Sequence, residues 1–352
     1  MATRPPGGAW SYARAGVDLD QRARALSLLL DQVRYRAPPT HGRAVNLPGH
    51  FAGLVRIGRE TLAVTTDTVG TKVLLAAEVG RWEEVGEDIV GVNVNDLAAV
   101  GARPAGLVDV ILCARAEDPP FESIGRGLDR GLRSAQCTLL GGETAIVPEI
   151  VSGIDLGGTA IGFFPRDRAP VTGTRIRPKD RILGIPSVGL HANGYTLVRR
   201  LLHEARVDLQ RPRPGGQEPA GTELLRATRI YAGLADAVAS RVELHGLAHL
   251  SGGGVRNLVR LNPRVAFVLD RWPEPPSLFG WIQGLGGIPD EEMFQTFNMG
   301  IGFALVVAPE HLAEIRRRLS RAGAPDAIEI GHVERGSGIE LPRWKIRYSG
   351  YV

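Results

Sequence analysis

The sequence predicts a two-domain protein of the α/β (or α+β) class. Its 352 residues exceed what one typical core accommodates. In both halves, short apolar runs of strand length alternate with longer stretches of helical spacing, a pattern typical of packed sheets and helices. Residues 165–181 are charged and turn-rich, with prolines at 165, 170 and 178, so we predict a linker there. The predicted domains are residues 1–168 and 169–352.

The first half opens with an irregular segment that leads into a Leu- and Arg-rich helix at 20–34. A loop is expected at 37–49, which holds three prolines and two glycines. Gly101 stands where a C-cap glycine would end a helix at 85–101. The other elements expected here are strands at 53–57, 62–67, 105–113, 138–141 and 154–164, and a helix at 120–135.

The second half restarts with a strand at R-I-L-G-I-P-S, from residue 181. Helices are expected at 194–205 and 222–240, on either side of a polar insert at 210–221. The remaining predicted elements are strands near 265–270 and 300–307, helices near 277–284 and 309–322, and terminal strands.

The composition favours a cytoplasmic protein with no membrane and no nucleic-acid partner. No apolar run approaches the roughly 20 residues that cross a bilayer, and residues 1–10 lack the apolar core of a secretion signal. The net charge of +4 comes from scattered basic residues with acids between them, which is not typical of a nucleic-acid-binding protein. Cys113 and Cys137 lack metal-ligand spacing and are expected to be reduced thiols.

Three carboxylates of the first half lie at predicted strand ends or near glycines. Asp67 follows a strand, Asp96 lies in N-V-N-D-L-A-A-V-G-A, and Glu143 follows Gly141 and Gly142. Any one of these acids alone is also typical of a turn or a helix N-cap. Together they suit a Mg²⁺–nucleotide site, because magnesium prefers oxygen ligands and commonly uses carboxylates with phosphate oxygens. We therefore predict Asp67, Asp96 and Glu143 as metal ligands.

The lysine in D-T-V-G-T-K is informative because this chain rarely uses lysine. Of 42 basic residues, 39 are Arg, and the three lysines are Lys72, Lys179 and Lys345. A compact ammonium on a short tether suits a phosphate where the fork of an arginine does not fit. The stretch therefore indicates that Lys72 balances phosphate charge.

Two histidine-bearing turns stand out in the second half. G-L-H-A-N-G-Y contains His191 and Asn193, and A-H-L-S-G-G-G contains His249. Glycine-rich turns that open a helix offer backbone N–H groups to an anion, although either histidine alone is more typical of a buried structural residue. The sequence has no P-loop, no dinucleotide-binding glycine motif and no G-x-S-x-G motif, which argues against those enzyme classes.

Taken together, eight stretches point to one enzyme family. They are S-Y-A-R-A-G-V-D-L-D (11–20), D-T-V-G-T-K (67–72), V-N-D-L-A-A-V-G-A-R-P (94–104), L-L-G-G-E-T-A (139–145), G-L-H-A-N-G-Y-T-L-V-R (189–199), T-R-I-Y (228–231), H-G-L-A-H-L-S-G-G-G (245–254) and E-M-F-Q-T-F-N-M-G-I-G (292–302). Through these stretches the sequence resembles the phosphoribosylformylglycinamidine cyclo-ligase family, whose members are also called aminoimidazole ribonucleotide synthetases.

The resemblance implies a fold, a reaction and two cofactors. An N-terminal mixed-sheet domain would pair with its twin in a homodimer, with ATP near that interface, and a C-terminal α/β domain would complete the substrate cleft. The implied reaction is the ATP-dependent ring closure of formylglycinamidine ribonucleotide to 5-aminoimidazole ribonucleotide in purine biosynthesis. It releases ADP and phosphate, proceeds through a phosphorylated amide oxygen, and uses Mg²⁺.

The resemblance also implies roles for individual residues. The residues expected to bind Mg²⁺–ATP are Asp67, Thr71, Lys72, Asp96, Gly141, Gly142 and Glu143. The residues expected on the substrate side are His191, Asn193, His249, Gly252, Gly253 and Asn298. Among these, Lys72, His191 and His249 are the expected catalytic residues, for phosphate contact or proton transfer.

Two positions depart from the family's usual pattern. Ala13 stands where the family has a lysine, whose role is either lost or taken by Arg14. Ile146 stands where the family often has an acid, so no role is carried over to it. Two alternatives stay open: a small-molecule kinase similar to thiamine-phosphate kinase, and a non-catalytic ATP-binding scaffold. A degenerate scaffold would be expected to have lost one of Asp67, Asp96 or Glu143, and all three are present.

Overall fold

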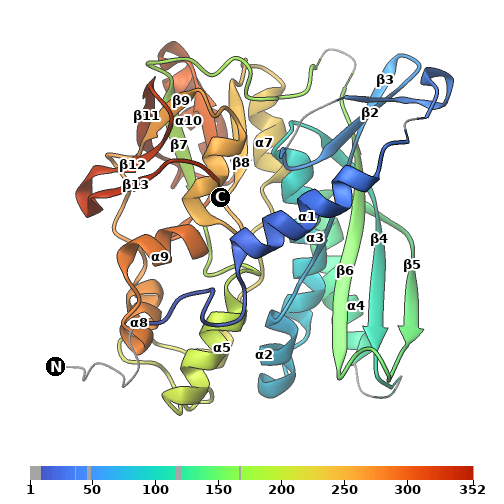
Figure 1. Cartoon of the computed structure of the whole chain (residues 1–352), viewed down its shortest axis with the longest axis vertical. Helices are drawn as coiled ribbons and strands as arrows, with labels where there is room; N and C mark the ends of the chain where they lie inside the picture. The colour runs from blue at the N-terminus through green and yellow to red at the C-terminus, as the bar shows by residue number, and fades with distance from the viewer. Residues whose placement is uncertain are drawn as a thin grey trace.

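The computed structural model describes residues 9–35, 37–45, 49–115, 117, 120–165 and 168–351. Within these ranges the chain forms two β-sheets with helices beside them, one sheet from each half of the sequence (Figure 1). The predicted mixed α/β class is confirmed. None of the helices in these ranges is both long and apolar enough to span a membrane.

The first sheet has six strands in the order β1-β2-β3-β6-β4-β5. The strands are β1 (Arg43–Val45), β2 (Gly53–Ile57), β3 (Glu60–Thr68), β4 (Arg103–Cys113), β5 (Thr138–Ile146) and β6 (Ile154–Phe163). The helices of this half are α1 (Leu19–Gln32), α2 (Lys72–Val79), α3 (Glu83–Ala98) and α4 (Phe121–Ala135). Neighbouring strands are antiparallel except β4 and β5, which run parallel because α4 carries the chain back between them.

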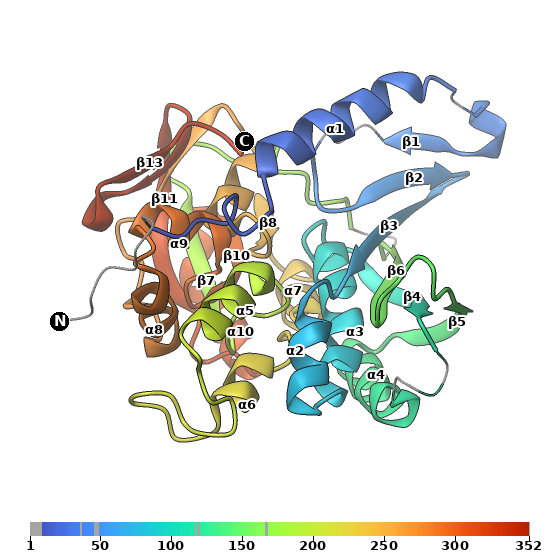
Figure 2. The same ribbon diagram turned by 60° about the horizontal axis from the view of Figure 1, so that its bottom comes forward.

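Helix α3 covers one face of this sheet. It contacts β3, β4 and β6, and α4 packs against it, so these helices lie on the same side of the strands (Figure 2). A Cβ added to Gly127 would lie 1.8 Å from the Glu83 carbonyl oxygen, and one added to Gly86 would lie 2.2 Å from the Ile124 carbonyl oxygen. Only glycine permits so close an approach, and α3 is therefore held firmly between the sheet and α4.

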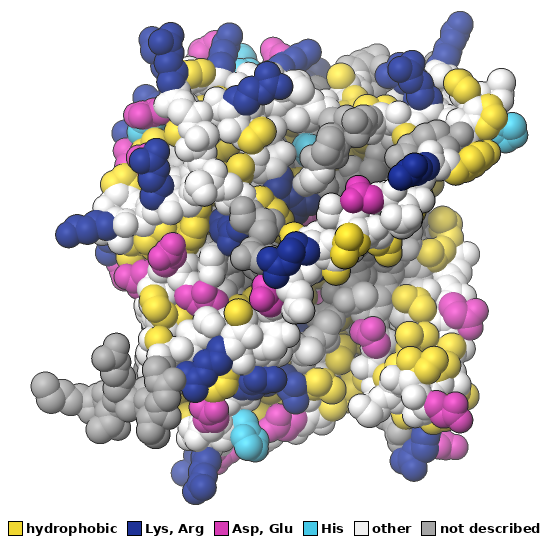
Figure 3. Space-filling view, viewed as in Figure 1, with side chains coloured by type: hydrophobic (Ala, Val, Ile, Leu, Met, Phe, Trp, Pro, Cys, Tyr) yellow, Lys and Arg dark blue, Asp and Glu magenta, His cyan; other side chains and the backbone are white. Residues whose placement is uncertain are grey.

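The opposite face of the sheet carries exposed apolar side chains. Val108 and Val110 on β4 are 39% and 38% exposed, whereas Leu107, which points to the α3 face, is fully buried. Figure 3 shows hydrophobic side chains gathered on the side of the molecule where β4, β5 and β6 lie, while basic and acidic side chains are interspersed over the rest of that view.

The second sheet has seven strands in the order β13-β12-β9-β11-β7-β10-β8. The strands are β7 (Arg181–Pro186), β8 (Gly246–His249), β9 (Val265–Val268), β10 (Ile301–Val307), β11 (Ile328–Arg335), β12 (Gly338–Leu341) and β13 (Ile346–Tyr348). The α-helices are α5 (Tyr195–Glu204), α6 (Ala220–Leu225), α7 (Ala232–Ala239), α8 (Ser277–Gly286), α9 (Asp290–Thr296) and α10 (Leu312–Arg321). β9 and β12 are parallel, and the other neighbouring pairs are antiparallel.

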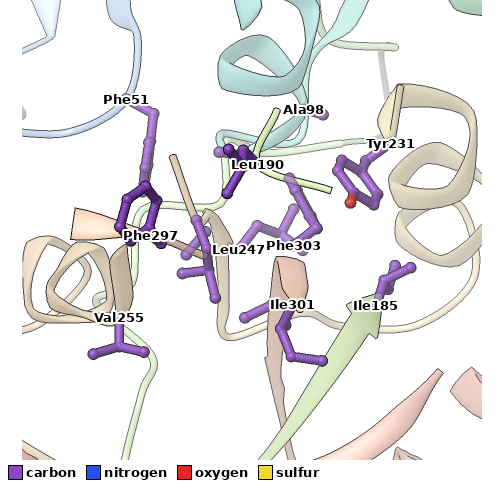
Figure 4. Close-up of a cluster of buried hydrophobic side chains, with 14 of the residues drawn as sticks. Phe51, Ala98, Ile185, Leu190, Tyr231, Leu247, Val255, Phe297, Ile301 and Phe303 are labelled. Atoms are coloured by element: carbon purple, nitrogen blue, oxygen red, sulfur yellow. The ribbon is translucent and has the colours of Figure 1, made fainter. Parts of the chain in front are cut away.

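A shared hydrophobic core joins the two halves (Figure 4). Phe51 and Ala98 from the first half belong to the same buried cluster as Leu190, Leu247 and Phe303 from the second. Each of these side chains is at most 5% exposed. The boundary between residues 168 and 169 stays a prediction.

Several predicted elements are wrong in detail. The helix expected at 222–240 is two helices, α6 and α7, because the backbone of residues 226–231 bonds to side chains of α3. The helix expected to end at Gly101 ends at Ala98, and β5 runs on to Ile146. Four short elements were not predicted: α2, α9, β8 and β1, which lies within the loop expected at 37–49.

Candidate active site

Asp67, Asp96 and His249 come together although they are far apart in the sequence. Asp67 is the second-last residue of strand β3, Asp96 lies in the last turn of α3, and His249 ends strand β8. The Nδ1 atom of His249 lies 2.9 Å from Oδ1 of Asp96, with the two side chains 1% and 15% exposed. A carboxylate partner favours the tautomer with the proton on Nδ1, which leaves Nε2, an atom without a hydrogen-bond partner, as an acceptor.

The environment of Asp67 destabilises its charged form. Desolvation by the surrounding protein, followed by the charge of Asp96, raises the pKa of Asp67 to about 6, although the residue is open to solvent. A hydrogen bond of 2.8 Å from the Thr68 N–H to Oδ1 of Asp67 acts in the opposite direction. No lysine or arginine of the described residues forms an ion pair with either carboxylate. Two neighbouring carboxylates that lack such an ion pair suit the binding of a divalent cation, whose charge would reduce the repulsion between them.

Asn93 is a site residue that sequence reasoning missed. It lies on α3 three positions before Asp96, so both side chains project from the same side of the helix. Its Nδ2 donates to the Ile89 carbonyl at 2.9 Å and to the Asp67 carbonyl at 3.4 Å, while its buried Oδ1 has no partner. The spacing in N-V-N-D was the available signal.

Glu143 lies on the other face of the sheet. In register, Asp67 pairs with Gly158, Asp109 and Gly142, whereas Glu143 lies one residue further along, in the row that contains Val110. Successive side chains point to opposite faces, and three strand spacings separate β3 from β5 by about 14 Å. Among the described residues, no group of three or more His, Cys, Asp or Glu side chains is arranged to hold a metal ion. The structure therefore does not bring Glu143 to Asp67 and Asp96 within one chain.

The two glycines before Glu143 differ in their surroundings. A Cβ added to Gly142 would lie 2.1 Å from Oδ1 of Asp109, so this carboxylate packs directly over the glycine backbone. A Cβ on Gly141 would meet nothing within 4 Å, but its φ of +152° favours glycine.

Lys72 is fully buried and points away from solvent. Its Nζ lies 2.6 Å from Oδ2 of Asp88 and donates to the Arg226 carbonyl at 2.8 Å. Its neighbour Thr71 faces Thr196 of the second half, with 3.0 Å between their hydroxyl oxygens. The expected contact of Lys72 with a phosphate would need this buried pair to open.

His191 is buried and carries two unpartnered ring nitrogens. Burial, followed by the nearby His249, lowers the pKa of His191 well below its usual value, so the ring is neutral at physiological pH. Its ring centroid lies 6.4 Å from that of His249 and 6.0 Å from that of Tyr231. The backbone of His191 has a φ of +63°, which is uncommon for a residue with a side chain and is typical of functional turns.

The other expected substrate residues border these histidines. Asn193 packs against Gly252, since a Cβ there would lie 2.8 Å from its Oδ1, and Gly253 has a φ of +101°. Asn298 has its side chain fully engaged: Oδ1 accepts from Ser187 and Gly300, and Nδ2 donates to Gly189, each at 2.9 Å. Asn298 therefore fixes the turn that carries His191.

Both halves of the chain match models of known domains. Residues 49–164 match the N-terminal domain of AIR synthase related proteins, and residues 177–342 match the C-terminal domain of the same proteins. A solved structure with the same fold is that of AaThiL complexed with AMPPCP and TMP, at a TM-score of 0.65 and 17% identity, covering 95% of this chain and 98% of that chain.

Curated relatives are considerably more similar in sequence. A phosphoribosylformylglycinamidine cyclo-ligase of Methanosarcina barkeri is 42% identical over 85% of this chain and 89% of that protein. Its counterpart in Methanothermobacter thermautotrophicus is 40% identical over 94% of this chain and 96% of that protein. With this identity over nearly the full length and both domains matched, the chain belongs to the phosphoribosylformylglycinamidine cyclo-ligase family.

Proposed function

We propose that the protein closes the imidazole ring of 5-aminoimidazole ribonucleotide from formylglycinamidine ribonucleotide and ATP, releasing ADP and phosphate, in purine biosynthesis. The observation that carries the proposal is the Asp67–Asp96 pair beside His249, in a chain whose relatives carry the cyclo-ligase name. A pair of carboxylates that forms no ion pair with a lysine or arginine of the described residues suits a Mg²⁺-bound nucleotide.

The proposed chemistry needs positioning more than a protein nucleophile. The γ-phosphoryl group of ATP passes to the formyl oxygen of the substrate, which turns a poor leaving group into a good one. The amidine nitrogen of the same molecule then attacks the activated carbon, phosphate leaves with the oxygen, and the ring closes. Because the attacking nitrogen belongs to the substrate, the protein mainly orients the reactants and neutralises charge.

Individual residues take the following proposed roles. Asp67 and Asp96 hold Mg²⁺, which when bound neutralises charge on the phosphates. The free Nε2 of His249 and the neutral ring of His191 are the proposed sites for proton transfer or phosphate contact. Asn193 and Gly252 line the substrate side. AaThiL, which shares the fold, was solved in complex with the ATP analogue AMPPCP, and this supports ATP as the phosphoryl donor.

We also propose that the exposed face of the first sheet pairs with the same face of a second chain. Val64, Val108, Val110 and Phe163 are apolar and between 37% and 41% exposed, which is typical of a surface that another molecule covers. Glu143 lies on this face, so any contact it makes with the nucleotide would come through the proposed interface.

The affinity for Mg²⁺–ATP is expected to fall as the pH drops through about 6. Because the pKa of Asp67 is raised to about 6, its carboxylate is charged above that pH and neutral below it, and only the charged form attracts a cation. Between about pH 7 and about pH 5 we expect the protonation of Asp67 to weaken the binding of Mg²⁺–ATP roughly tenfold. Titration calorimetry measures this change, with Asp67→Asn as the control because both proteins share the titration of ATP itself. Parallel pH profiles for the two proteins would contradict the assignment.

The test of the reaction is ADP release with and without formylglycinamidine ribonucleotide, while the aminoimidazole product is followed. We expect substrate-dependent ADP that matches product one for one. ADP without the product would instead favour a small-molecule kinase. ATP binding without any ADP release would favour the scaffold.

A further inference from the structure

A buried ion pair connects the two halves of the chain beside the candidate site. Lys72 and Asp88 have no exposed side-chain surface, and their charged atoms lie 2.6 Å apart. Lys72 also donates to the Arg226 carbonyl and lies 5.5 Å from the centre of the Tyr195 ring. Both of these partners belong to the second half, whereas Lys72 begins α2 of the first.

Asp88 fixes the segment 226–231, which separates α6 from α7. Its Oδ1 accepts from the backbone N–H of Thr228 at 2.8 Å and from the hydroxyl of Thr228 at 2.6 Å. Two turns further along α3, Asn95 donates to the Arg229 carbonyl at 2.9 Å and accepts from the Tyr231 N–H at 2.7 Å. This segment is therefore tied to α3 by polar groups that are all removed from water.

The network joins the two sides of the candidate site. Lys72 directly follows residues 69–71, the nucleotide turn, which connect it to the end of β3 where Asp67 lies. Tyr231, at the other end, packs beside His191 and donates its hydroxyl to the Pro186 carbonyl at 3.0 Å. The position of the nucleotide turn relative to His191 thus depends on contacts that start at Lys72 and Asp88.

We infer that Lys72 and Asp88 are positioning residues that hold the nucleotide turn against the second half, and that Lys72 does not contact the transferred phosphate. The activity arm of the test rests on the proposed function, whereas Mg²⁺–ATP binding and thermal unfolding do not. An ammonium already occupied by a carboxylate and a carbonyl has little capacity left for a ligand, and freeing it would leave the buried Asp88 charge unpaired.

The inference is tested with Lys72→Met, Asp88→Asn and the double variant. Each single variant leaves one buried charge without its partner, and we expect the unfolding midpoint to fall by roughly 5–10 °C. Well below that midpoint, the Kd for Mg²⁺–ATP should rise and kcat/KM should fall by at least about tenfold, because the turn is displaced. The double variant has no charge at these two positions, and the amide oxygen at position 88 can still accept from Thr228. We therefore expect it to recover most of the stability, the affinity and the activity.

Other outcomes would overturn the inference. If the double variant regains stability but not affinity or activity, Lys72 contacts the phosphate. If the single variants lose stability but keep the wild-type Kd and kcat/KM, the pair stabilises the fold but does not position the nucleotide turn. Lys179→Met makes the same substitution at an exposed position and should match the wild type in every measurement. If the wild type has no cyclo-ligase activity, the affinity and stability results still decide between these outcomes.

Discussion

Asp96→Asn is expected to lower kcat for ring closure by about a thousandfold while the protein stays folded. The substitution keeps the size of the side chain and an oxygen for the His249 contact, but it removes one of the two charges that face the proposed cation. It also relieves the repulsion on Asp67, so the unfolding midpoint should not fall. ADP release and product formation measure the loss, and a thermal scan confirms the fold.

The matched control for this variant is Asp129→Asn. Asp129 is an exposed acid of α4 that pairs with Arg133 on the helix surface, so the same chemical change there should leave turnover unaffected. Normal turnover in Asp96→Asn would contradict the assignment of Asp96 as a metal ligand. A loss that is accompanied by unfolding would also count against it, because the expected effect is on charge alone.

Val108→Arg is expected to convert a dimer into monomers. Val108 lies on β4, an interior strand of the sheet, and pairing of two such apolar faces would bury the new charge without a partner. We expect the dissociation constant of the dimer to rise by at least about a hundredfold. Sedimentation velocity measures the change, since the wild type should have twice the chain mass of 37.8 kDa and the variant only that mass.

Val188→Arg is the control for the sheet face. Val188 is 40% exposed, close to the 39% of Val108, but it belongs to the second half of the chain. This variant should remain dimeric. A wild type that is monomeric at micromolar concentration, or a Val108→Arg variant that stays dimeric, would contradict the proposed interface.

Hydrophobic spacing predicted most long elements of the fold because most of them bury a continuous face. Helix α4, for example, was expected at 120–135 and is found at Phe121–Ala135. The error at 222–240 has a different origin. The local sequence there is compatible with one helix, but Asp88 and Asn95 bind the backbone of 226–231, and those residues lie more than 130 positions earlier.

The candidate site was also predictable only in part. The turn of Asp67 and the helix of Asp96 can be read from motifs, and the structure brings both to His249. The partner of Lys72 could not be predicted, because the sequence alone does not show whether the ammonium group of a lysine contacts a phosphate or a buried carboxylate. Glu143 was grouped with Asp67 because strand register, which decides the face of each side chain, is not visible in one sequence.

The contacts between α3 and segment 226–231 also limit how such a chain can be recombined during evolution. A chimera that takes its first half from one relative and its second half from another must inherit Asp88 with Thr228, whose hydroxyl donates to it, or leave buried polar groups without partners. The two halves are therefore not interchangeable modules, even though each has its own sheet. Substitutions at Asp88 and Thr228 should appear as linked changes across lineages.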